Sequence, residues 1–270
     1  MREFEYVVLG GAFTLTVLLL GVAAVLKAFS EKMPVNVGRN LGLVKTGQLG
    51  WLDFVGVGFV IIYYIGSWVA HATNPGQEDA SVWMLLGQIL VQASFAMVIV
   101  GMLFWRTRFE DFWGLRWEKW PIGLSLVLGG FLAFKCFSAL LWVFGYEDWA
   151  TEAYQRDEYL TLRQSQEPTV LTIFLWSLST ALVAPITEEI VFRGYIHPML
   201  KRAGGIWLAV FTTSLFFAAA HMDGAGLLPF FMMGLLLSLA YEVSGSLWAP
   251  LGIHFLNNAY VVIVTLKNSV

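Results

Sequence analysis

Residues 170–200 read VLTIFLWSLSTALVAPITEEIVFRGYIHPML, and this stretch decides how the chain folds. It begins with mainly apolar residues, passes Pro185, and then carries two adjacent glutamates and an arginine. An apolar block of roughly 18 or more residues is typical of a membrane-spanning helix. The stretch is longer than one span needs. We therefore expect one helix that kinks near Pro185 and leaves the bilayer close to Lys201.

Apolar blocks of similar length recur along the whole chain. Hydrophobic residues make up 58% of the 270 residues and charged residues 13%, whereas a soluble domain carries about 25% charged residues. The pattern contains no soluble domain, internal repeat or low-complexity segment. The fold class that we predict is all-α, a polytopic membrane bundle of about eight transmembrane helices. The expected spans are residues 6–26, 51–70, 82–105, 121–145, 170–200, 206–222, 227–243 and 247–266.

Charge and cysteine content narrow the function classes. The net charge of −3 gives no basic field that would attract nucleic acid. The expected partner is the lipid bilayer. A single cysteine, Cys136, excludes an internal disulfide and a cysteine-based metal site. The first apolar block is too long for a cleavable signal peptide and lacks a basic start. We expect an integral, multi-pass protein of a prokaryotic plasma membrane.

The first polar cluster at membrane depth is EEIVFR, residues 188–193. An ionisable residue inside a span costs several kcal/mol and is a functional candidate by default. Glu189 and Arg193 are four residues apart on one helix face and can pair. Glu188 points about 100° away from that face. A structural ion pair explains Glu189 and Arg193, but it leaves the second carboxylate unexplained.

The second cluster is FAAAH, which ends at His221. A lone histidine at a helix end is more often a structural hydrogen-bonding group than a catalyst. However, Gly204 and Gly205 mark a turn between two helices. Glu188 lies sixteen residues before Gly204, and His221 lies sixteen residues after Gly205. In an antiparallel hairpin the two side chains are therefore expected at the same depth, where a carboxylate and a histidine can activate water.

The third cluster is HFLNN, in which His254 and Asn258 are four residues apart on one face. A buried asparagine can simply tie helices together, so a structural reading stays open. A straight seventh helix would leave His254 far from the level of His221. Convergence requires the link at residues 222–226 to enter the membrane region as non-helical backbone, which is permitted only inside protein or a wet cavity.

Three other ionisable residues look less informative. Lys135 is expected to snorkel or to pair with an acid within its span. His197 is expected outside the hydrocarbon layer. Glu242 is expected to cap the seventh helix or to face water.

Taken together, the three clusters resemble the CAAX-protease and bacteriocin-processing family of intramembrane endopeptidases, which includes the type II CAAX prenyl proteases. The family pattern is Glu-Glu-x-x-x-Arg, then Phe-x-x-x-His, then His-x-x-x-Asn, on late transmembrane helices. All three motifs stand here in that order, at residues 188–193, 217–221 and 254–258. The resemblance covers roughly residues 105–266. It predicts a catalytic core at 106–270, preceded by N-terminal transmembrane helices at 1–105 that carry no diagnostic motif.

The resemblance implies proteolysis and a role for each motif residue. Glu188 would activate water together with His221. Glu189 and Arg193 would hold the geometry of the site. The substrate would be a membrane-associated protein or peptide, and the sequence does not say whether it is prenylated or how the protein assembles.

The remaining motif residues, His254 and Asn258, would stabilise the oxyanion of the tetrahedral intermediate. Two histidines and a carboxylate also make a possible zinc site of Glu188, His221 and His254. Since an amide oxygen is a poor zinc ligand, Asn258 favours a mechanism that uses no metal or other cofactor. Zinc is the alternative.

Two other function classes stay open. A membrane scaffold or immunity protein could keep this fold without activity, but it should then lose a motif residue. A proton-coupled transporter could use Glu188 and the histidines as a relay, but it should show inverted repeats and broken helices in both halves of the chain. The chain lacks the His-Glu-x-x-His motif of zinc site-2-type proteases.

Overall fold

The computed structural model describes residues 16, 42–46, 50–73, 81–115, 120–146, 169–221, 223 and 226–269. The secondary structure assigned within these ranges is helical, without strands, so the predicted all-α membrane bundle is confirmed. The expected first span at 6–26 lies outside the described residues except for Thr16. Five described helices are long and apolar enough to cross a membrane, as an integral membrane protein requires.

The helices follow the predicted blocks closely. Two shorter helices accompany the long ones: α4, between the third and fourth expected spans, and α11, which ends one residue before His221. The bounds are α2 Trp51–Thr73, α3 Val82–Phe104, α4 Phe109–Phe112, α5 Trp120–Val143, α11 Ile206–Ala220, α12 Leu227–Ser244 and α13 Trp248–Ser269.

The stretch after Thr169 is one continuous helical run, interrupted twice by π-helix; the expected kink near Pro185 stays a prediction. The first π segment ends at Val183, two residues before Pro185, and the second begins at Glu189, so the turn that carries Glu188 is flanked on both sides. π-Helical turns are uncommon and occur frequently at functional sites. The five parts are α8 Val170–Leu178, η1 Ser179–Val183, α9 Ala184–Glu188, η2 Glu189–Ile196 and α10 His197–Gly204.

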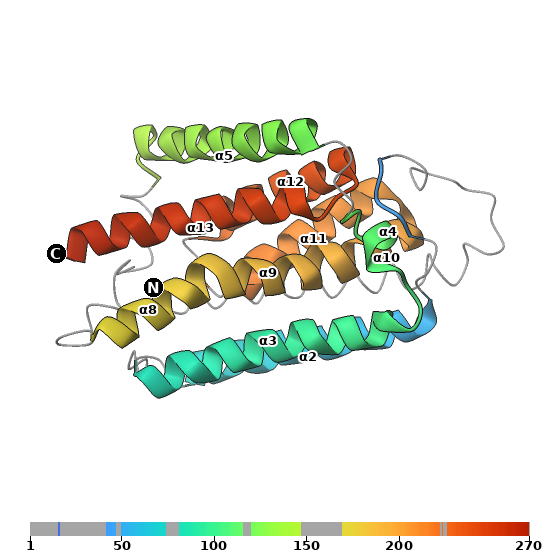
Figure 1. Cartoon of the computed structure of the whole chain (residues 1–270), viewed down its shortest axis with the longest axis horizontal. Helices are drawn as coiled ribbons and strands as arrows, with labels where there is room; N and C mark the ends of the chain where they lie inside the picture. The colour runs from blue at the N-terminus through green and yellow to red at the C-terminus, as the bar shows by residue number, and fades with distance from the viewer. Residues whose placement is uncertain are drawn as a thin grey trace.

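The helices lie roughly side by side along the long axis of the molecule (Figure 1). The run α8–α10 and α13 occupy the middle, with α5 at one edge and α2 and α3 at the other. At one end α2 and α3 are joined by Asp53, whose carboxylate accepts two hydrogen bonds from the Arg106 guanidinium at 2.7 and 3.0 Å. These hydrogen bonds raise the pKa of Arg106.

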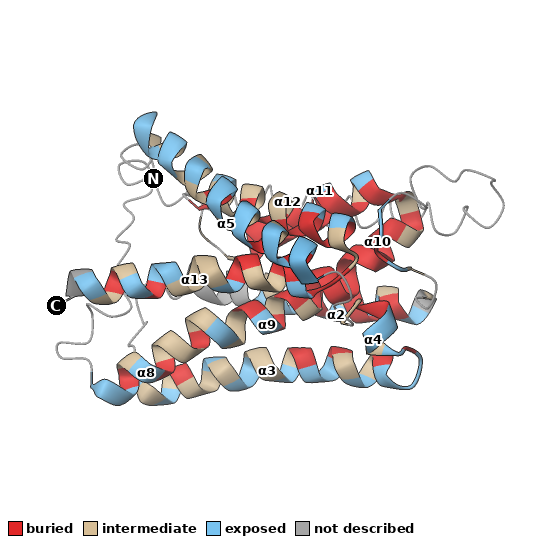
Figure 2. Ribbon diagram, turned by 45° about the horizontal axis from the view of Figure 1, so that its top comes forward, coloured by how far each residue is buried: buried red, intermediate tan, exposed pale blue. Residues whose placement is uncertain are grey.

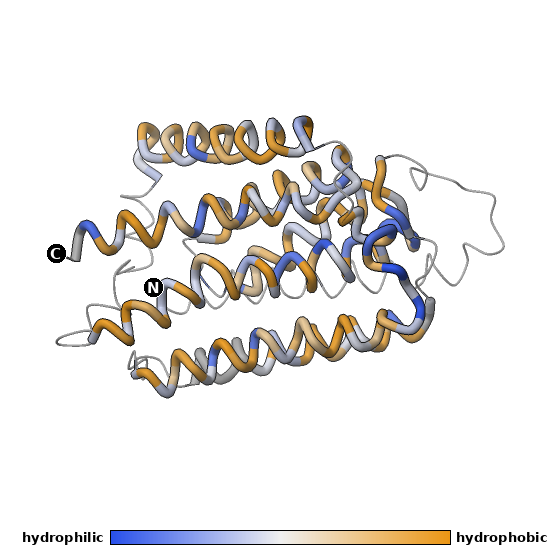
Figure 3. The backbone as a smooth tube through the Cα atoms, viewed as in Figure 1, coloured by the Kyte–Doolittle hydropathy of each residue, from blue (hydrophilic) through white to orange (hydrophobic). Residues whose placement is uncertain are grey.

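Burial is uneven across this bundle. Figure 2 shows the buried residues concentrated where α9, α10, α11 and α12 meet, whereas α5 is largely exposed. Apolar residues line the lengths of the helices, and hydrophilic ones gather at the end near α4 and α10 (Figure 3). Exposed apolar side chains such as Trp83 and Trp142 fit a lipid-facing surface. The polar motif residues therefore lie in the part of the bundle that is shielded by protein.

Close packing of α11 against α12 brings backbone into this interior. A Cβ atom added to Gly234 of α12 would lie 2.8 Å from the Cα atom of Ser214 in α11. Only glycine allows the two helices to approach this closely. This approach places the backbone of α12 within reach of side chains from the central helical run.

Candidate functional site

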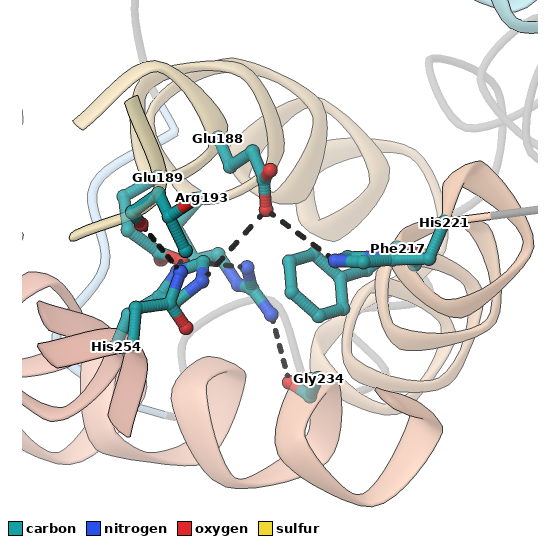
Figure 4. Close-up of polar contacts among 9 residues, drawn as sticks. Glu188, Glu189, Arg193, Phe217, His221, Gly234 and His254 are labelled. Carbon is teal, nitrogen blue, oxygen red and sulfur yellow. Dashed lines mark hydrogen bonds and ion pairs between the residues drawn. The ribbon is translucent and has the colours of Figure 1, made fainter. Parts of the chain in front are cut away.

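Glu188 forms the centre of the site (Figure 4). It ends α9, and His221 follows the last residue of α11, as the depth count across the Gly204–Gly205 turn predicted. The His221 Nε2 atom lies 3.9 Å from Glu188 Oε2. The two side chains are 24% and 19% exposed, so this edge of the site is accessible while most of it is enclosed.

His254 approaches the same carboxylate from α13. Its Nε2 atom lies 3.8 Å from Glu188 Oε2, and only 4% of its side chain is exposed. Residues far apart in the chain thus converge on one oxygen atom, which the depth count alone could not establish. The enabling feature is the short helix α11: it ends at Ala220, so the turn at His221 lies level with the middle of the α8–α10 run.

A buried ion pair supports His254 from the other side. Glu189 Oε1 lies 2.8 Å from His254 Nδ1 and accepts a hydrogen bond from Arg193 Nη1 at 2.9 Å. Arg193 also donates to the Gly234 carbonyl at 3.2 Å, and its guanidinium lies over the Phe217 ring at 4.5 Å. Both charged side chains are fully buried. The predicted pairing of Glu189 with Arg193 is confirmed.

The hydrogen bonds of the two imidazoles fix their tautomers. His221 Nδ1 lies 2.7 Å from the Phe217 carbonyl oxygen, which can only accept, so Nδ1 carries the proton. The same argument applies to His254 Nδ1, which faces the Glu189 carboxylate. Phe230 stacks on His221 with ring centroids 3.9 Å apart and holds its plane. Both Nε2 atoms are therefore turned toward Glu188 Oε2, which has no hydrogen-bond partner among the described residues.

Asn258 lies one turn beyond His254 on α13, but its contact is with another segment. Its Nδ2 atom donates to the backbone carbonyl of Thr180 at 2.9 Å. Thr180 belongs to the π segment η1, before Glu188 in the chain. The predicted role of Asn258 as an oxyanion donor stays a prediction, with one amide N–H engaged in this bond.

The chemical types of the three donor groups suit a zinc ion, but the distances between their donor atoms are wider than those between zinc ligands. Glu188, His221 and His254 offer a carboxylate oxygen and two imidazole nitrogens, and each histidine donates its other N–H as zinc-bound histidines do. Ligands about 2.0–2.1 Å from a tetrahedral zinc stand roughly 3.3 Å apart, against 3.8 and 3.9 Å here. Among the described residues, no group of three such side chains has the geometry of a metal site.

A second buried polar cluster, which sequence reasoning missed, lies near the end of α10. Glu242 accepts hydrogen bonds from Lys201 Nζ at 2.7 Å, and its other oxygen lies 2.8 Å from His197 Nε2. The expectation that Glu242 caps a helix or faces water is wrong, because its side chain is 2% exposed and its carboxylate bonds to Lys201. His197 and Lys201 are equally buried, and their expected place relative to the bilayer stays a prediction. His197 and Lys201 are four residues apart, so the spacing that identified Glu189 and Arg193 could have flagged them.

The comparisons with known proteins agree with the three motifs. Residues 170–260 match the family described as type II CAAX prenyl endopeptidase Rce1-like. The chain is 36% identical over 104 residues to the membrane-embedded CAAX protease MroQ of Staphylococcus aureus, which is 36% of this chain and 41% of that protein. It is 31% identical over 93 residues to YdiL of Bacillus subtilis, covering 34% and 38% of the two chains.

A shorter segment is similar to a mammalian protein. CAAX prenyl protease 2 of Homo sapiens is 49% identical over 51 residues, or 19% of this chain and 15% of that protein. The matched part thus spans less than half the length of each of these relatives. No solved structure matches the chain. The matched range, residues 170–260, contains every motif residue, so the predicted resemblance is confirmed.

Proposed function

We propose that the protein is an intramembrane endopeptidase that hydrolyses peptide bonds of a membrane-associated protein or peptide. The observation that carries the proposal is the convergence of two imidazole Nε2 atoms on the unpaired Glu188 Oε2, at 3.8 and 3.9 Å. These gaps exceed a direct hydrogen bond, and a water molecule between the groups can bridge them. A carboxylate beside such a water is the arrangement that general-base catalysis requires.

In the proposed reaction, Glu188 and His221 activate the water. Glu188 takes a proton as the water oxygen bonds to the scissile carbonyl carbon, which gives a tetrahedral intermediate. His221 orients the water through its Nε2 lone pair, which the Phe217 carbonyl directs toward Glu188. When the C–N bond breaks, the proton held by Glu188 passes to the leaving amine, and the carboxylate is regenerated. General acid–base catalysis of this kind contributes about 10²–10⁴-fold in rate.

His254 supplies the charge that stabilises the oxyanion. In the proposed reaction His254 acts as an imidazolium, whose charge offsets one carboxylate of the cluster while Arg193 offsets the other. Neutrality is favourable where solvent is excluded, because an unbalanced buried charge costs several kcal/mol. Its Nε2–H is then a donor for the developing oxyanion, and its Nδ1–H remains bonded to Glu189.

We propose that this reaction proceeds without a metal. A zinc ion held by Glu188, His221 and His254 would polarise the substrate carbonyl and lower the pKa of a bound water. It would also need both Nε2 atoms unprotonated. The wide spacings between the donor atoms favour the metal-free form.

The rival classes make different demands on the same site. For a proton relay, a continuous polar path should lead away from Glu188. The neighbours Glu189, Arg193 and His254 instead bond to one another, and Arg193 bonds further to the Gly234 backbone carbonyl. A scaffold has no use for a buried carboxylate oxygen without a hydrogen-bond partner, which is costly to keep. Proteolysis accounts for both features. The proposed location is the plasma membrane of a prokaryote, in line with the bacterial relatives.

The proposal is tested by incubating the purified protein in detergent with a library of peptides and membrane-anchored peptides. We expect site-specific cleavage, and we expect the Glu188→Ala variant to be inactive while its unfolding temperature is unchanged. Lys135→Met, a substitution in α5 away from the motif residues, is the matched control and should cleave normally. Equal cleavage by wild type and Glu188→Ala would refute the assignment.

The metal question has its own experiment. We expect a strong chelator to leave cleavage unchanged, and elemental analysis of active protein to find less than one zinc per chain. Loss of activity on chelation with recovery on adding Zn²⁺ would overturn the metal-free form but keep the protease assignment, because the same three side chains would then be ligands.

A further inference from the structure

Pro185 leaves one carbonyl of the central helix without a backbone donor. In the π segment η1 the hydrogen bonds run from residue i+5 to residue i, and the N–H of Ala184 bonds to the Ser179 carbonyl. The next bond in this register would run from residue 185 to Thr180. Proline has no N–H, so the Thr180 carbonyl has no such partner within the helix.

Asn258 supplies the missing donor from α13. Its Nδ2 lies 2.9 Å from the Thr180 oxygen. At membrane depth no bulk water can satisfy a free carbonyl, so this contact removes a costly unpaired group. A proline on one helix and an asparagine on another thus form a complementary pair.

The bond also fixes the register between α13 and the catalytic helix. The two helices run antiparallel: His254 meets Glu189, and Asn258, one turn later in the chain, meets Thr180, which precedes Glu189. Two contacts on one side of α13 determine both its height and its rotation. They therefore determine where His254 Nε2 stands relative to Glu188.

We infer that Asn258 is a positioning residue: it caps the carbonyl freed by Pro185 and so holds His254 and Glu188 in register. The inference deepens the proposed function and rests on it for its kinetic part. Its structural part, the coupling of Asn258 to Pro185, stands independently of any substrate.

A double-mutant cycle separates the two roles. The variants are Asn258→Ala, Pro185→Ala and the double variant, each measured for cleavage rate and for unfolding temperature in detergent. The Pro185→Ala substitution restores a backbone N–H that can bond to the Thr180 carbonyl. We expect Asn258→Ala alone to lower the unfolding temperature and to slow cleavage on the order of tenfold or more, and both losses to shrink at least severalfold in the Pro185→Ala background.

A direct oxyanion role gives a different pattern. Asn258→Ala would then slow cleavage by the same factor in both backgrounds and leave the unfolding temperature unchanged, and this result would overturn the inference. If Pro185→Ala fails to fold, hydrogen–deuterium exchange of wild type and Asn258→Ala decides. Faster exchange over residues 179–188 supports the inference, and unchanged exchange refutes it. Since exchange and unfolding need no substrate, a failure of the protease assignment would remain distinguishable.

Discussion

Two polar clusters in this molecule each combine a glutamate with histidine. They differ in whether the carboxylate oxygens have hydrogen-bond partners. The first holds Glu188 with His221 and His254. In the second, Glu242 is bonded to Lys201 at 2.7 Å and lies 2.8 Å from His197. The carboxylate oxygens of Glu242 are both engaged, whereas Glu188 Oε2 has no hydrogen-bond partner within the described ranges and faces two imidazoles at 3.8 and 3.9 Å.

The difference shows what makes a buried carboxylate available for chemistry. The Glu242 cluster also ties residues 42–46 to the end of the bundle, since Lys201 donates to the Val44 carbonyl and the Leu43 N–H donates to the Glu242 carbonyl. Both carboxylate oxygens of Glu242 are within hydrogen-bond distance of a partner, and the cluster lies at a helix end that the motifs do not reach. A carboxylate whose two oxygens are engaged in hydrogen bonds stabilises a fold, while one with an oxygen that lacks a hydrogen-bond partner can take a proton from water.

The largest effects are expected when the glutamate of each cluster is replaced by glutamine, which exchanges one carboxylate oxygen for an amide nitrogen. Glu188→Gln removes the base and should lower the cleavage rate about 10²–10⁴-fold, with the unfolding temperature retained. Glu242→Gln leaves Lys201 without a counter-charge and should cost about 3–5 kcal/mol of stability. Any activity lost by Glu242→Gln should follow the folded fraction. Cleavage assays and thermal unfolding in detergent measure both quantities for both variants.

The comparison fails if the two variants behave alike. A large drop in unfolding temperature for Glu188→Gln would mean that Glu188 is a structural carboxylate like Glu242. A specific loss of cleavage in fully folded Glu242→Gln would mean that the second cluster also takes part in the reaction.

Arg193 is expected to contribute both to the stability of the fold and to catalysis. It neutralises Glu189 and holds the α12 backbone through Gly234. Arg193→Ala strands a fully buried carboxylate, so we expect a loss of about 3–5 kcal/mol in unfolding free energy together with reduced cleavage. Denaturant or thermal unfolding in detergent tests this. An unchanged unfolding temperature would show that the pair does not contribute to stability.

A smaller effect is expected from the glycine that lets α12 approach. Gly234→Ala places a Cβ atom 2.8 Å from the Ser214 backbone and pushes α12 away from α11, with a cost of about 1–3 kcal/mol. Cleavage should fall as well, because the Gly234 carbonyl holds Arg193. Gly101→Ala in α3 is the matched control, since an added Cβ there meets nothing within 4 Å among the described residues. Equal unfolding temperatures for the two variants would contradict the role of close packing.

Much of the fold and half of the site geometry could be predicted from sequence, because both depend on local periodicity. Apolar run length gave the helices, the four-residue spacing gave the pair of Glu189 with Arg193, and counting from the glycine turn gave the level of His221. The approach of His254 depends on how whole helices tilt and pack, which no local pattern encodes. The same holds for the contact between Glu242 and His197, 45 residues apart.

The π segments were missed for a different reason. Pro185 suggested a kink because a proline lacks one hydrogen bond and its ring clashes with the preceding turn. Whether the helix bends or widens its turn depends on which group satisfies the freed carbonyl. In this fold the donor is Asn258, 78 residues away. A partner this distant along the chain cannot be identified from a local pattern.

The smallest effect is expected at Lys135, and it tests whether depth alone marks a functional charge. Lys135 lies within the span Trp120–Val143, where ionisable residues are functional candidates by default. The expected acidic partner is not among its described contacts; the ammonium group lies 4.1 Å from the centre of the Tyr260 ring instead.

A cation–π contact is worth about 0.5–1 kcal/mol when partly exposed, and removing the charge also removes the cost of holding it in the bilayer. The two terms oppose each other, so Lys135→Met should change the unfolding free energy by less than about 1 kcal/mol and leave cleavage within about twofold. Tyr260→Leu, which removes the ring and keeps the charge, should be the more destabilising of the two. A strong loss of cleavage in folded Lys135→Met would show that an intramembrane charge can serve the reaction without joining the cluster around Glu188. The contrast between Glu188 and Glu242 would then be an incomplete account of the site.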